Sequence, residues 1–572
     1  MNNDPSLTSG EEIHTREIER KFVLSDLPLQ LLDSVEPLHI EQGYIRTRGD
    51  VESRVRAIDE SEYVFTVKSG EGLDRGEKNT TITAAEFEAL WPFTENARIR
   101  KSRYPIPHRD GLTVELDVFA DDLDGLIEAE VEFASLADAE TYDAEPWLGR
   151  EVTGNKLYGN KSLALRGMDG GKEYVTPHVE LAQGVESLII YVNVLALSLR
   201  RPITVAVAGG SASGKTSAVA DKVGEHFGDR AIVLSMDDYY KGTAFMESQK
   251  AAGVELNWDQ PEAVDIELAA KHLAELRAGR PIEKPIYDFK TGERVGYEVV
   301  DPTKTRVDAI VIEGLFALTD AVAEAADITT FVDIETHGRM MRRLLRDVVR
   351  TGWDPSQILG YFKTLEDMHQ AYVAPTIGNA DIIIDNGYNA RVEAMRAGMS
   401  EVQVKYPVTE LTLEQLRQSG AELISPRTRQ VDTYYNPKVG DFGLSDEIIR
   451  TRETAGQILF GYKGPRVDDP STRRRPKIEF PITAEALADF EQVYQQPTKR
   501  IYKDRSMSLY HGVLIALDEV HVSDAGDMRD VGAFVELRTN DESDAGRQLL
   551  EDIARQLGLD PATRELRCYD EM

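Results

Sequence analysis

The eight residues from Gly209 to Thr216 constrain the fold of this chain more than any other stretch. They read Gly-Gly-Ser-Ala-Ser-Gly-Lys-Thr and match the spacing G-x-x-x-x-G-K-T. The apolar run at 203–208 predicts a buried parallel strand before them, and residues 217–223 predict a helix after them. A glycine loop between a strand and a helix lets backbone N–H groups surround phosphate oxygens, and the helix N-terminus adds partial positive charge. The sequence therefore predicts a phosphate-binding loop.

Two side chains of this loop have predicted roles. Lys215 is expected to reach the β- and γ-phosphates of ATP, and Thr216 is expected to hold Mg²⁺. The whole loop forms the predicted ATP-binding set, which consists of Gly209, Gly210, Ser211, Ala212, Ser213, Gly214, Lys215 and Thr216.

Composition excludes several other classes of protein. The net charge of −34 argues against nonspecific nucleic-acid binding. Cys568 is the single cysteine, so a disulfide framework is excluded, and the polar, acidic N-terminus has no signal-peptide pattern. The most apolar stretch, 185–199, is too short to span a bilayer and predicts a helix packed between domains. We expect a cytoplasmic protein without a membrane partner.

The order of predicted elements divides the 572 residues into blocks. Residues 13–168 and 400–572 alternate short strand patterns with charged turns, whereas residues 200–395 alternate strands with helices. The middle pattern predicts a parallel sheet with helices on both faces. We therefore expect a disordered tail at 1–12, an antiparallel domain at 13–168, a linker with a helix at 169–199, an α/β P-loop domain at 200–395 and a second antiparallel domain at 400–572.

Two buried strands of the middle block lead to acidic residues. The run at 233–235 leads to Asp237, and the run at 309–312 leads to Glu313. The carboxyl ends of parallel strands face the nucleotide crevice, so Asp237 is a candidate for taking a proton from an attacking hydroxyl and Glu313 for holding Mg²⁺. A strand-end acid more often caps a turn, but the order after a phosphate-binding loop favours the catalytic interpretation.

Arginines are concentrated on one predicted helix after Glu313. Arg339, Arg343, Arg346 and Arg350 follow the spacing i, i+4, i+7, i+11 and share a face. A solvated basic face is the alternative interpretation. In so acidic a chain, we favour a lid that closes over phosphates, with Arg343 and Arg346 as catalytic candidates.

The middle block resembles the uridine kinase and phosphoribulokinase family in the segments 209–216, 235–237, 257–261, 285–289, 312–314 and 342–347. The resemblance implies a P-loop kinase that uses ATP, with Asp237 as general base and Asp259 and Tyr287 in the acceptor pocket. Gly292 stands where nucleoside kinases of the family carry a base-contacting histidine, and 351–353 reads Thr-Gly-Trp where Arg-Gly-Arg is usual. The acceptor therefore stays open between a nucleoside-like compound and another small hydroxyl compound.

Charged residues recur at every second position in the first block. Such positions share one face of a strand, as in the pairs 17/19, 54/56, 101/103 and 115/117. This pattern alone favours an antiparallel sheet with one solvated, charged face. The alternative is a closed sheet whose lumen holds acids for a divalent metal and bases for a polyphosphate.

The opening Glu-x-Glu-x-Lys at 17–21 resembles the CYTH family, also called triphosphate tunnel metalloenzymes. The resemblance continues through Lys68, 99–104 and 114–119, and it implies an eight-stranded antiparallel tunnel that hydrolyses triphosphates with Mg²⁺ or Mn²⁺. The implied metal-side residues are Glu17, Glu19, Asp117, Glu130 and Glu132. The implied phosphate-side residues are Lys21, Arg54, Arg56, Lys68, Lys101 and Arg103.

The third block resembles the same family more loosely. Gln403 replaces the second opening glutamate, and Arg538 replaces a late glutamate. The basic residues Arg450, Arg452, Lys463, Lys503 and Arg505 remain. Because metal needs anionic oxygens and phosphate needs cations, we expect this domain to bind anions without hydrolysing them.

Three functions are consistent with this organisation. The first is an ATP-dependent kinase of the uridine kinase type, fused to tunnel domains that bind or hydrolyse triphosphate. The second is a pyro- or triphosphate hydrolase with the P-loop domain as partner, and the third is a nucleotide- or polyphosphate-sensing regulator. The expected small-molecule partners are ATP, an acceptor and a polyphosphate or organic triphosphate, and self-association stays open.

Overall fold

The structure is a computed structural model that describes residues 18–33, 35–48, 51–69, 76–254, 256–350, 354–387, 400–408, 413–466, 473–495, 497, 499–524, 527–541 and 543–572. The chain forms two compact units. One unit contains Met1–Asp333 and His369–Asn386, and the other contains Ile334–Met368 and Gly387–Met572. Each unit is described by itself below.

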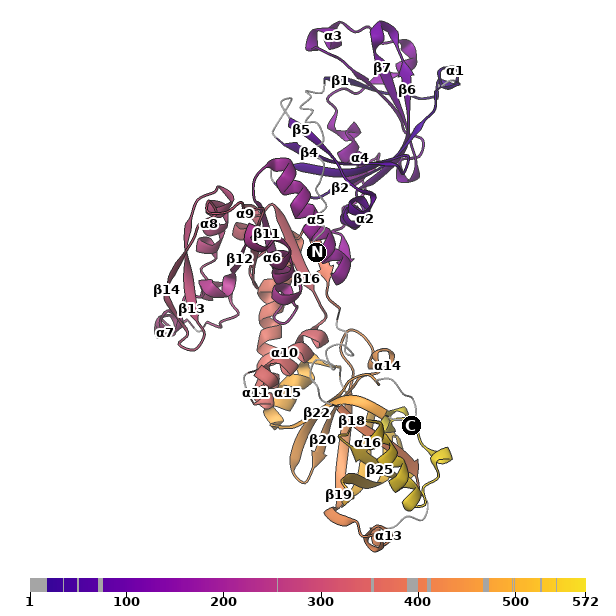
Figure 1. The fold of residues 1–572 in the computed structure, drawn as a ribbon, viewed down its shortest axis with the longest axis vertical. Coiled ribbons are helices and arrows are strands. Elements are labelled where there is room, and N and C mark those ends of the chain that lie inside the picture. Colours follow the sequence, from indigo (N-terminus) through magenta and orange to yellow (C-terminus); the bar gives the residue numbers. More distant parts are fainter. Residues whose placement is uncertain are drawn as a thin grey trace. The chain divides into compact units, whose positions relative to one another are not determined.

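The first unit begins with an antiparallel sheet, as predicted (Figure 1). Within the described residues its strand order is β5-β4-β3-β2-β6-β7-β8-β1-β9. The strands are β1 (Glu19–Val23), β2 (Leu38–Ile45), β3 (Glu52–Ile58), β4 (Glu62–Ser69), β5 (Gly76–Thr81), β6 (Arg98–Pro107), β7 (Thr113–Phe119), β8 (Ile127–Glu132) and β9 (Arg150–Glu151). The helices of this region are α1 (Leu29–Leu32), α2 (Ala84–Leu90), α3 (Leu136–Thr141) and α4 (Asn160–Arg166). The ninth strand, β9, is a two-residue addition at the outer edge of β1.

A parallel sheet follows in the same unit. Its order is β10-β17-β16-β11-β15-β12, and every neighbouring pair is parallel. The strands are β10 (His178–Glu180), β11 (Ile203–Gly209), β12 (Ala231–Ser235), β15 (Ala309–Glu313), β16 (Ile328–Asp333) and β17 (Ile382–Asp385). A separate hairpin consists of β13 (Ile282–Asp288) and β14 (Glu293–Val300).

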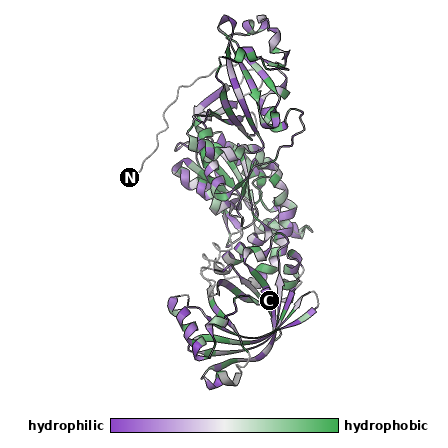
Figure 2. Cartoon of the chain, turned by 90° about the vertical axis from the view of Figure 1, so that its right-hand side faces the viewer, coloured by the Kyte–Doolittle hydropathy of each residue, from purple (hydrophilic) through white to green (hydrophobic). Residues whose placement is uncertain are grey.

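Helices cover both faces of the parallel sheet, as predicted. Val205 and Val207 of β11 pack in one core with α5 (Leu181–Leu199) and α6 (Asp221–Phe227). Ala206 and Ala208 point the other way, into a core with α8 (Ile266–Arg277) and α9 (Asp320–Ala325). Every residue of β11 is therefore buried, which explains its continuous apolar run. Figure 2 shows many hydrophobic residues, in green, in the part of the chain that contains this sheet. The remaining helix, α7 (Thr243–Ala251), precedes the hairpin.

The apolar stretch at 185–199 lies in α5, a helix packed between the two sheets. Tyr191 on this helix hydrogen-bonds to Ser53 of β3 at 2.7 Å and contacts the ring of Phe65. The same core contains Ile203 and Val205 of the parallel sheet. Among the described residues, α5 has the length and composition of a membrane span, but half of that window is buried in the protein.

The second unit is built around a closed antiparallel barrel, which confirms the predicted fold of the third block. In the described residues its eight strands run in the order β18-β22-β21-β20-β19-β23-β24-β25. Their bounds are β18 (Ser400–Pro407), β19 (Glu422–Tyr435), β20 (Ile448–Thr454), β21 (Gln457–Lys463), β22 (Arg473–Ile482), β23 (Lys499–Tyr510), β24 (Val513–Asp524) and β25 (Asp527–Thr539). The helices that follow the start of the barrel are α13 (Leu413–Gln418), α14 (Phe442–Ser445), α15 (Ala484–Val493) and α16 (Asp544–Gln556).

Two helices from the middle of the sequence belong to this second unit. They are α10 (Thr336–Arg350) and α11 (Pro355–Met368), and they share a hydrophobic core with α15 and the barrel. A domain boundary at 200–395, drawn from the alternation of strands and helices, does not anticipate this grouping.

Candidate functional sites

The predicted phosphate-binding loop connects β11 to the helical segment η6 (Lys215–Ala220). Gly214 has φ = +90°, and a Cβ there would lie 2.3 Å from Nδ2 of Asn386. That amide donates a hydrogen bond of 2.6 Å to the carbonyl oxygen of Ser213. Only glycine combines this backbone conformation with this close approach. The end of β17, where Asn386 follows, therefore supports the loop.

The two predicted strand-end acids lie at the same edge of the sheet as the loop. Thr216 Oγ1 donates to Glu313 Oε2 at 2.9 Å, and Ser235 Oγ donates to Glu313 Oε1 at 2.6 Å. The backbone N–H of Asp237 donates to Ser235 Oγ at 3.3 Å. Glu313 is buried, so its two oxygens are held between the loop and β12. The hydroxyl of Thr216 and the carboxylate of Glu313 are the oxygen ligands that Mg²⁺ prefers.

The electrostatic surroundings of Asp237 suit a general base. Its side chain reaches solvent, yet burial of the carboxyl raises its pKa above that of an ordinary aspartate. Lys215 partly offsets this shift, and the carboxylates of Glu313 and Asp259 add to it. Three predicted site residues therefore act electrostatically on Asp237, and the raised pKa makes it a stronger base.

Aromatic rings surround the predicted acceptor residue Tyr287. Its ring centroid lies 5.4 Å from that of Tyr240 and 5.1 Å from that of Phe289, and Tyr240 also contacts Trp258 at 5.7 Å. Asp237 is among the charges that raise the pKa of Tyr287, after burial and Glu293. The backbone N–H of Asp259 donates to Asn257 Oδ1 at 2.9 Å. Such a cluster can stack on a flat ring, as in recognition of nucleobases.

Gly292 explains why a histidine is absent beside this cluster. The glycine has φ = +69°, and a Cβ would lie 2.4 Å from Thr243 Oγ1. Tyr287 Oη is 3.9 Å from the same Cβ position. A side chain at 292 would clash and strain the backbone, so polar contacts to an acceptor must come from other residues.

The arginines of α10 are divided between structural and candidate roles. Arg339 is buried and pairs with Glu366 of α11 at 2.6 Å, so it holds two helices together. Arg343 Nε and Arg346 Nε lie 3.3 and 2.6 Å from the carboxylate of Asp347. The side chain of Arg350 lies outside the described residues. The lid role of Arg343 and Arg346 stays a prediction.

Part of the charged face of the N-terminal sheet is buried rather than solvated. Asp117 is fully buried and accepts hydrogen bonds from Lys101 Nζ at 2.5 Å and from Arg103 Nε at 2.7 Å. Glu130 is also buried and pairs with Lys21 at 2.6 Å and with Arg103 at 3.0 Å. Buried charges persist only when they are paired, so this face is an organised set of acids and bases.

Glu128 is a candidate site residue that the sequence did not single out. It is fully buried, and within the described residues neither carboxylate oxygen has a hydrogen-bond partner; its ion pair with Lys21 is long, at 3.7 Å. Burial raises its pKa to about 7, with Lys21 opposing and Glu130 adding to the shift. Glutamates alternate at 128, 130 and 132, and this alternation could have indicated Glu128, but the family resemblance implies a metal role for Glu130 and Glu132 alone. An unsatisfied buried carboxylate next to Glu130 suits a divalent cation.

Asp117 and Glu130 lie beside Glu128, because Asp117 is its cross-strand partner and both carboxylates raise its pKa, but the rest of the predicted metal-side set does not gather there. Glu19 and Glu132 are cross-strand partners, and both are exposed. Glu17 lies outside the described residues. In the part of the chain that the structure describes, no group of three or more His, Cys, Asp or Glu side chains is placed to hold a metal ion. The five-residue metal set stays a prediction.

Three arginines form the phosphate-side part of the same face. Arg56 Nε donates to Gln42 Oε1 at 3.0 Å, and burial together with Arg54 and Arg103 lowers the pKa of Arg56 to about 10. Cations that repel one another in a buried place favour an anionic ligand. Lys68 pairs with Glu77 at 2.5 Å. The amide of Asn79 also donates to Glu77, at 3.1 Å.

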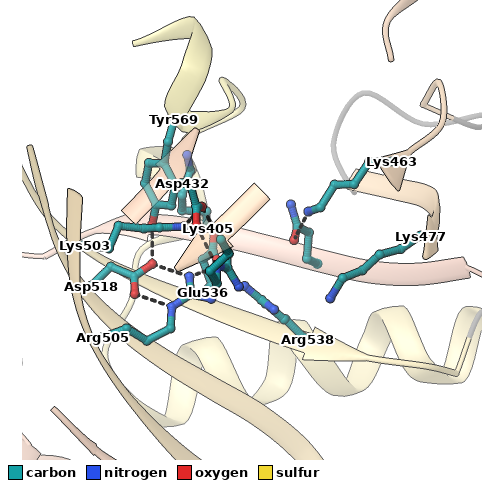
Figure 3. Close-up of polar contacts among 12 residues, drawn as sticks. Lys405, Asp432, Lys463, Lys477, Lys503, Arg505, Asp518, Glu536, Arg538 and Tyr569 are labelled. Carbon is teal, nitrogen blue, oxygen red and sulfur yellow. Dashed lines mark hydrogen bonds and ion pairs between the residues drawn. The ribbon is translucent and has the colours of Figure 1, made fainter. Parts of the chain in front are cut away.

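The interior of the C-terminal barrel holds a second set of buried charges (Figure 3). Asp432 is fully buried and accepts hydrogen bonds from Arg450, Arg452 and Lys503. Asp518 pairs with Arg505, and Lys463 Nζ donates to the Oε1 atom of Gln403 at 3.5 Å. A cavity opens beside them, lined by Gln403, Tyr434, Ile448, Arg450, Lys463, Lys503, Arg505, Glu536, Arg538, Cys568 and Tyr569. Five of these eleven residues are basic and one is acidic, which favours an anion.

Comparison with known proteins agrees with this division. Residues 204–393 match the Phosphoribulokinase / Uridine kinase family, and residues 399–569 match the CYTH domain. A uridine kinase of Geobacillus sp. (strain WCH70) is 39% identical over 192 residues, which are 33% of this chain and 88% of the relative. The chain belongs to the phosphoribulokinase/uridine kinase family. The family assignment of the middle block and the CYTH assignment of the third block are thereby confirmed.

Other members of the family cover a similar part of the chain. A uridine kinase of Halobacterium salinarum is 32% identical over 237 residues, which are 41% of this chain and 97% of that protein. Among solved structures, one described as an inorganic triphosphatase is 40% identical, covers 26% of this chain and 95% of its own, and has a TM-score of 0.23. Neither family match extends into residues 1–203, so the CYTH resemblance of the first block stays a prediction.

Proposed function

We propose that the protein is an ATP-dependent phosphotransferase that acts on a nucleoside-like or other small hydroxyl acceptor. The observation that carries the proposal is the convergence of Thr216, Glu313 and Asp237 at the end of the phosphate-binding loop. The names of the family relatives support a nucleoside as the first acceptor to test. The aromatic cluster around Tyr287 supports an acceptor with a flat ring.

Each residue has a defined part in the proposed reaction. Asp237 takes the proton from the acceptor hydroxyl while that oxygen attacks the γ-phosphorus of ATP, and the bond to the β–γ bridging oxygen breaks to release ADP. Lys215 stabilises the charge that develops on the phosphoryl oxygens. Thr216 and Glu313 would hold Mg²⁺, which when bound neutralises phosphate charge.

The test is ADP formation by the full chain with Mg²⁺ and a panel of acceptors that includes uridine, cytidine and small sugars. We expect ADP formation to depend on one class of acceptor. Asp237→Asn should lower this rate by 10²-fold or more, on the order expected for loss of a general base. Asp238→Asn is the matched control. It removes the carboxylate next to Asp237 in the sequence, and that carboxylate is paired with Lys284. Equal rates in the two variants would contradict the role of Asp237.

We also propose that the N-terminal sheet hydrolyses inorganic triphosphate or a related compound with Mg²⁺ or Mn²⁺. This second function rests on the unsatisfied carboxylate of Glu128 and on the guanidinium of Arg56, whose pKa is lowered by burial, Arg54 and Arg103. Phosphate release from tripolyphosphate without ATP tests it. Glu128→Gln should abolish this release, and Glu36→Gln, an exposed change outside the sheet, should not. Metal-independent release would contradict the proposal.

A further inference from the structure

The connection between two strands of the kinase sheet contains helices that belong to the other compact unit. The chain leaves the first unit after Asp333, at the end of β16, and returns at His369. Between these points α10 and α11 pack on the C-terminal barrel. Met341 and Leu344 of α10 and Leu359 of α11 are buried in one core with the barrel residues Ile449 and Phe460. The segment is therefore covalently part of the kinase and packed as part of the barrel.

A buried polar contact also ties α10 to the barrel. His337, near the start of α10, hydrogen-bonds through Nδ1 to the hydroxyl of Tyr494 at 2.7 Å and through Nε2 to Glu447 at 3.1 Å. The hydroxyl of Tyr462 on β21 donates to the same carboxylate at 2.8 Å. All four residues are buried. A small rotation of β21 would therefore also shift α10, because the buried hydrogen-bonded groups that connect them have few alternative partners.

The strands under α10 and α11 also line the basic cavity of the barrel. Successive side chains of a strand point to opposite faces. Tyr435, Ile449 and Tyr462 lie in the core with the helices. Their sequence neighbours on β19, β20 and β21 line the cavity, and these are Tyr434, Ile448, Arg450 and Lys463. Each of the three strands therefore presents one face to a cavity ligand and the other to α10 and α11.

The cavity favours a chain of phosphates. Lys463 on β21 and Lys477 on β22 are cross-strand partners, and both are half-buried at the edge of the charged interior (Figure 3). Asp432 and Asp518 already form ion pairs, with Arg450 and with Arg505. Added negative charge would thus meet lysines and arginines, which bind phosphate through charge-assisted hydrogen bonds.

The kinase ends of these connections lie beside the phosphate-binding loop. Val332, one residue before the end of β16, is the register partner of Gly209, and a Cβ on Gly209 would lie 2.5 Å from its carbonyl oxygen. Asn386, whose amide supports Ser213, is the last residue before the chain enters the second unit again. The chain therefore leaves the first unit at two points, after Asp333 and after Asn386, and both points lie next to residues that contact the loop.

We propose that a triphosphate group bound in the C-terminal barrel regulates the kinase centre through α10 and α11. The measurement of ADP formation that tests this inference rests on the proposed kinase function, whereas the measurement of hydrogen exchange does not. The ligand displaces strands β19–β21, these strands move the core that holds α10 and α11, and the change reaches the loop through β16. Inorganic triphosphate and a nucleoside triphosphate share the recognised chemistry.

The experiment uses the full chain and the imido analogue of inorganic triphosphate, which resists hydrolysis. Calorimetry measures the binding of this analogue. Hydrogen exchange of residues 336–368 measures the protection of backbone amides in α10 and α11, and ADP formation with uridine gives the KM for ATP. We expect binding, altered exchange in α10 and α11, and a change in KM of threefold or more. A parallel titration with the imido analogue of ATP on Lys215→Ala protein shows whether nucleotide binds the barrel as well.

Three variants separate the proposal from direct competition at the phosphate-binding loop. Lys463→Gln with Lys477→Gln should abolish analogue binding in the barrel and the shift in KM. Tyr462→Phe with Tyr494→Phe leaves Lys463 and Lys477 in place, so this variant should still bind the analogue. Because it removes two hydroxyls of the network around His337, the analogue should alter hydrogen exchange at 336–368 less than in the unmodified protein. Lys438→Gln, an exposed lysine on the barrel outside the cavity, is the matched control and should retain both.

Several results would overturn the inference. They are analogue binding that the double lysine variant leaves unchanged, binding in the barrel without altered exchange at 336–368, and a KM shift that persists in the double lysine variant. Loss of ADP formation with every acceptor, while exchange at 336–368 still responds, would instead reject the kinase proposal and leave the coupling supported.

Discussion

Replacing Asp432 by asparagine should strongly destabilise the C-terminal barrel. The carboxylate is fully buried and lies 2.7 Å from Arg450 Nη1 and 2.6 Å from Arg452 Nε, with Lys503 also bonded to it. These three cations hold the pKa of Asp432 well below its usual range despite burial. Asparagine keeps the volume and one acceptor oxygen, but it removes the counter-charge of Lys503 and leaves Arg450 and Arg452 with Glu479 as their remaining carboxylate partner.

The magnitude follows from the loss of a buried carboxylate that three cations share. Removing one partner of a buried ion pair costs about 3–5 kcal/mol. Burial and Arg452 lower the pKa of Lys503 well below its ordinary value, so this lysine can lose its proton in the variant. That relief places the expected loss nearer the lower figure, about 3 kcal/mol, or about 6–12 °C in Tm for a domain of this size.

Chemical denaturation of the full chain, with hydrogen exchange in β19, β20 and β23 to assign the loss to the barrel, measures the effect. Asp504→Asn is the matched control, because among the described residues this carboxylate on β23 pairs with the exposed Arg427 and Arg429. It should cost less than about 1 kcal/mol. Added inorganic triphosphate should restore more stability to Asp432→Asn than to the unmodified protein, because it replaces the lost charge.

The pH dependence has a definite sign. A carboxylate with a depressed pKa stabilises the fold above its unfolded-state pKa of about 3.9 and loses that contribution as the pH falls through its folded-state pKa. The difference between the unmodified protein and the variant should be full at neutral pH and shrink below about pH 4. A loss no larger than that of Asp504→Asn, or a difference that grows on acidification, would refute the reasoning.

Other predictions concern the first unit. Lys215→Ala should lower ATP-dependent turnover on the order of 10²-fold or more in steady-state assays, and near-native turnover would show that ATP binds elsewhere. The kinase rate should fall as the pH is lowered through a pKa above the ordinary aspartate value, because Asp237 must be ionised, and Asp237→Asn should lose that step in a pH–rate profile. Glu130→Gln should abolish tripolyphosphate hydrolysis while ATP turnover persists, and joint loss in a folded protein would indicate one composite site. Gly292→Ala should cost about 1–3 kcal/mol in unfolding free energy because of its positive φ and its contact with Thr243, and an unchanged Tm would contradict this.

Local pattern was sufficient for the phosphate-binding loop and its acids. The strand, glycine loop and helix lie within about twenty consecutive residues, and glycine spacing encodes the backbone directly. Glu313 and Asp237 could be predicted because parallel strands end at one edge of the sheet. The eight-stranded C-terminal barrel was likewise predictable from period-two charges together with the family resemblance.

Sequence could not rank the three glutamates at 128, 130 and 132. All three share one strand face, so periodicity treats them as equal. Cross-strand register decides which are buried, because Glu132 pairs with Glu19 at an exposed position while Glu128 lies deep in the sheet. Gly292 is similar, since the contact with Thr243 that excludes a side chain comes from a distant segment.

The sequence by itself determined the chemistry of the kinase centre, because a phosphate-binding loop is a local arrangement of backbone and a few side chains. Only the tertiary structure decided where α10 and α11 belong. The arginine spacing of α10 predicts a lid for the kinase, and nothing in that spacing reveals the core with Ile449 and Phe460 or the contact of His337 with Tyr494. Which surface a helix buries depends on partners about a hundred residues away, and that information resides in packing rather than in the helix's own pattern.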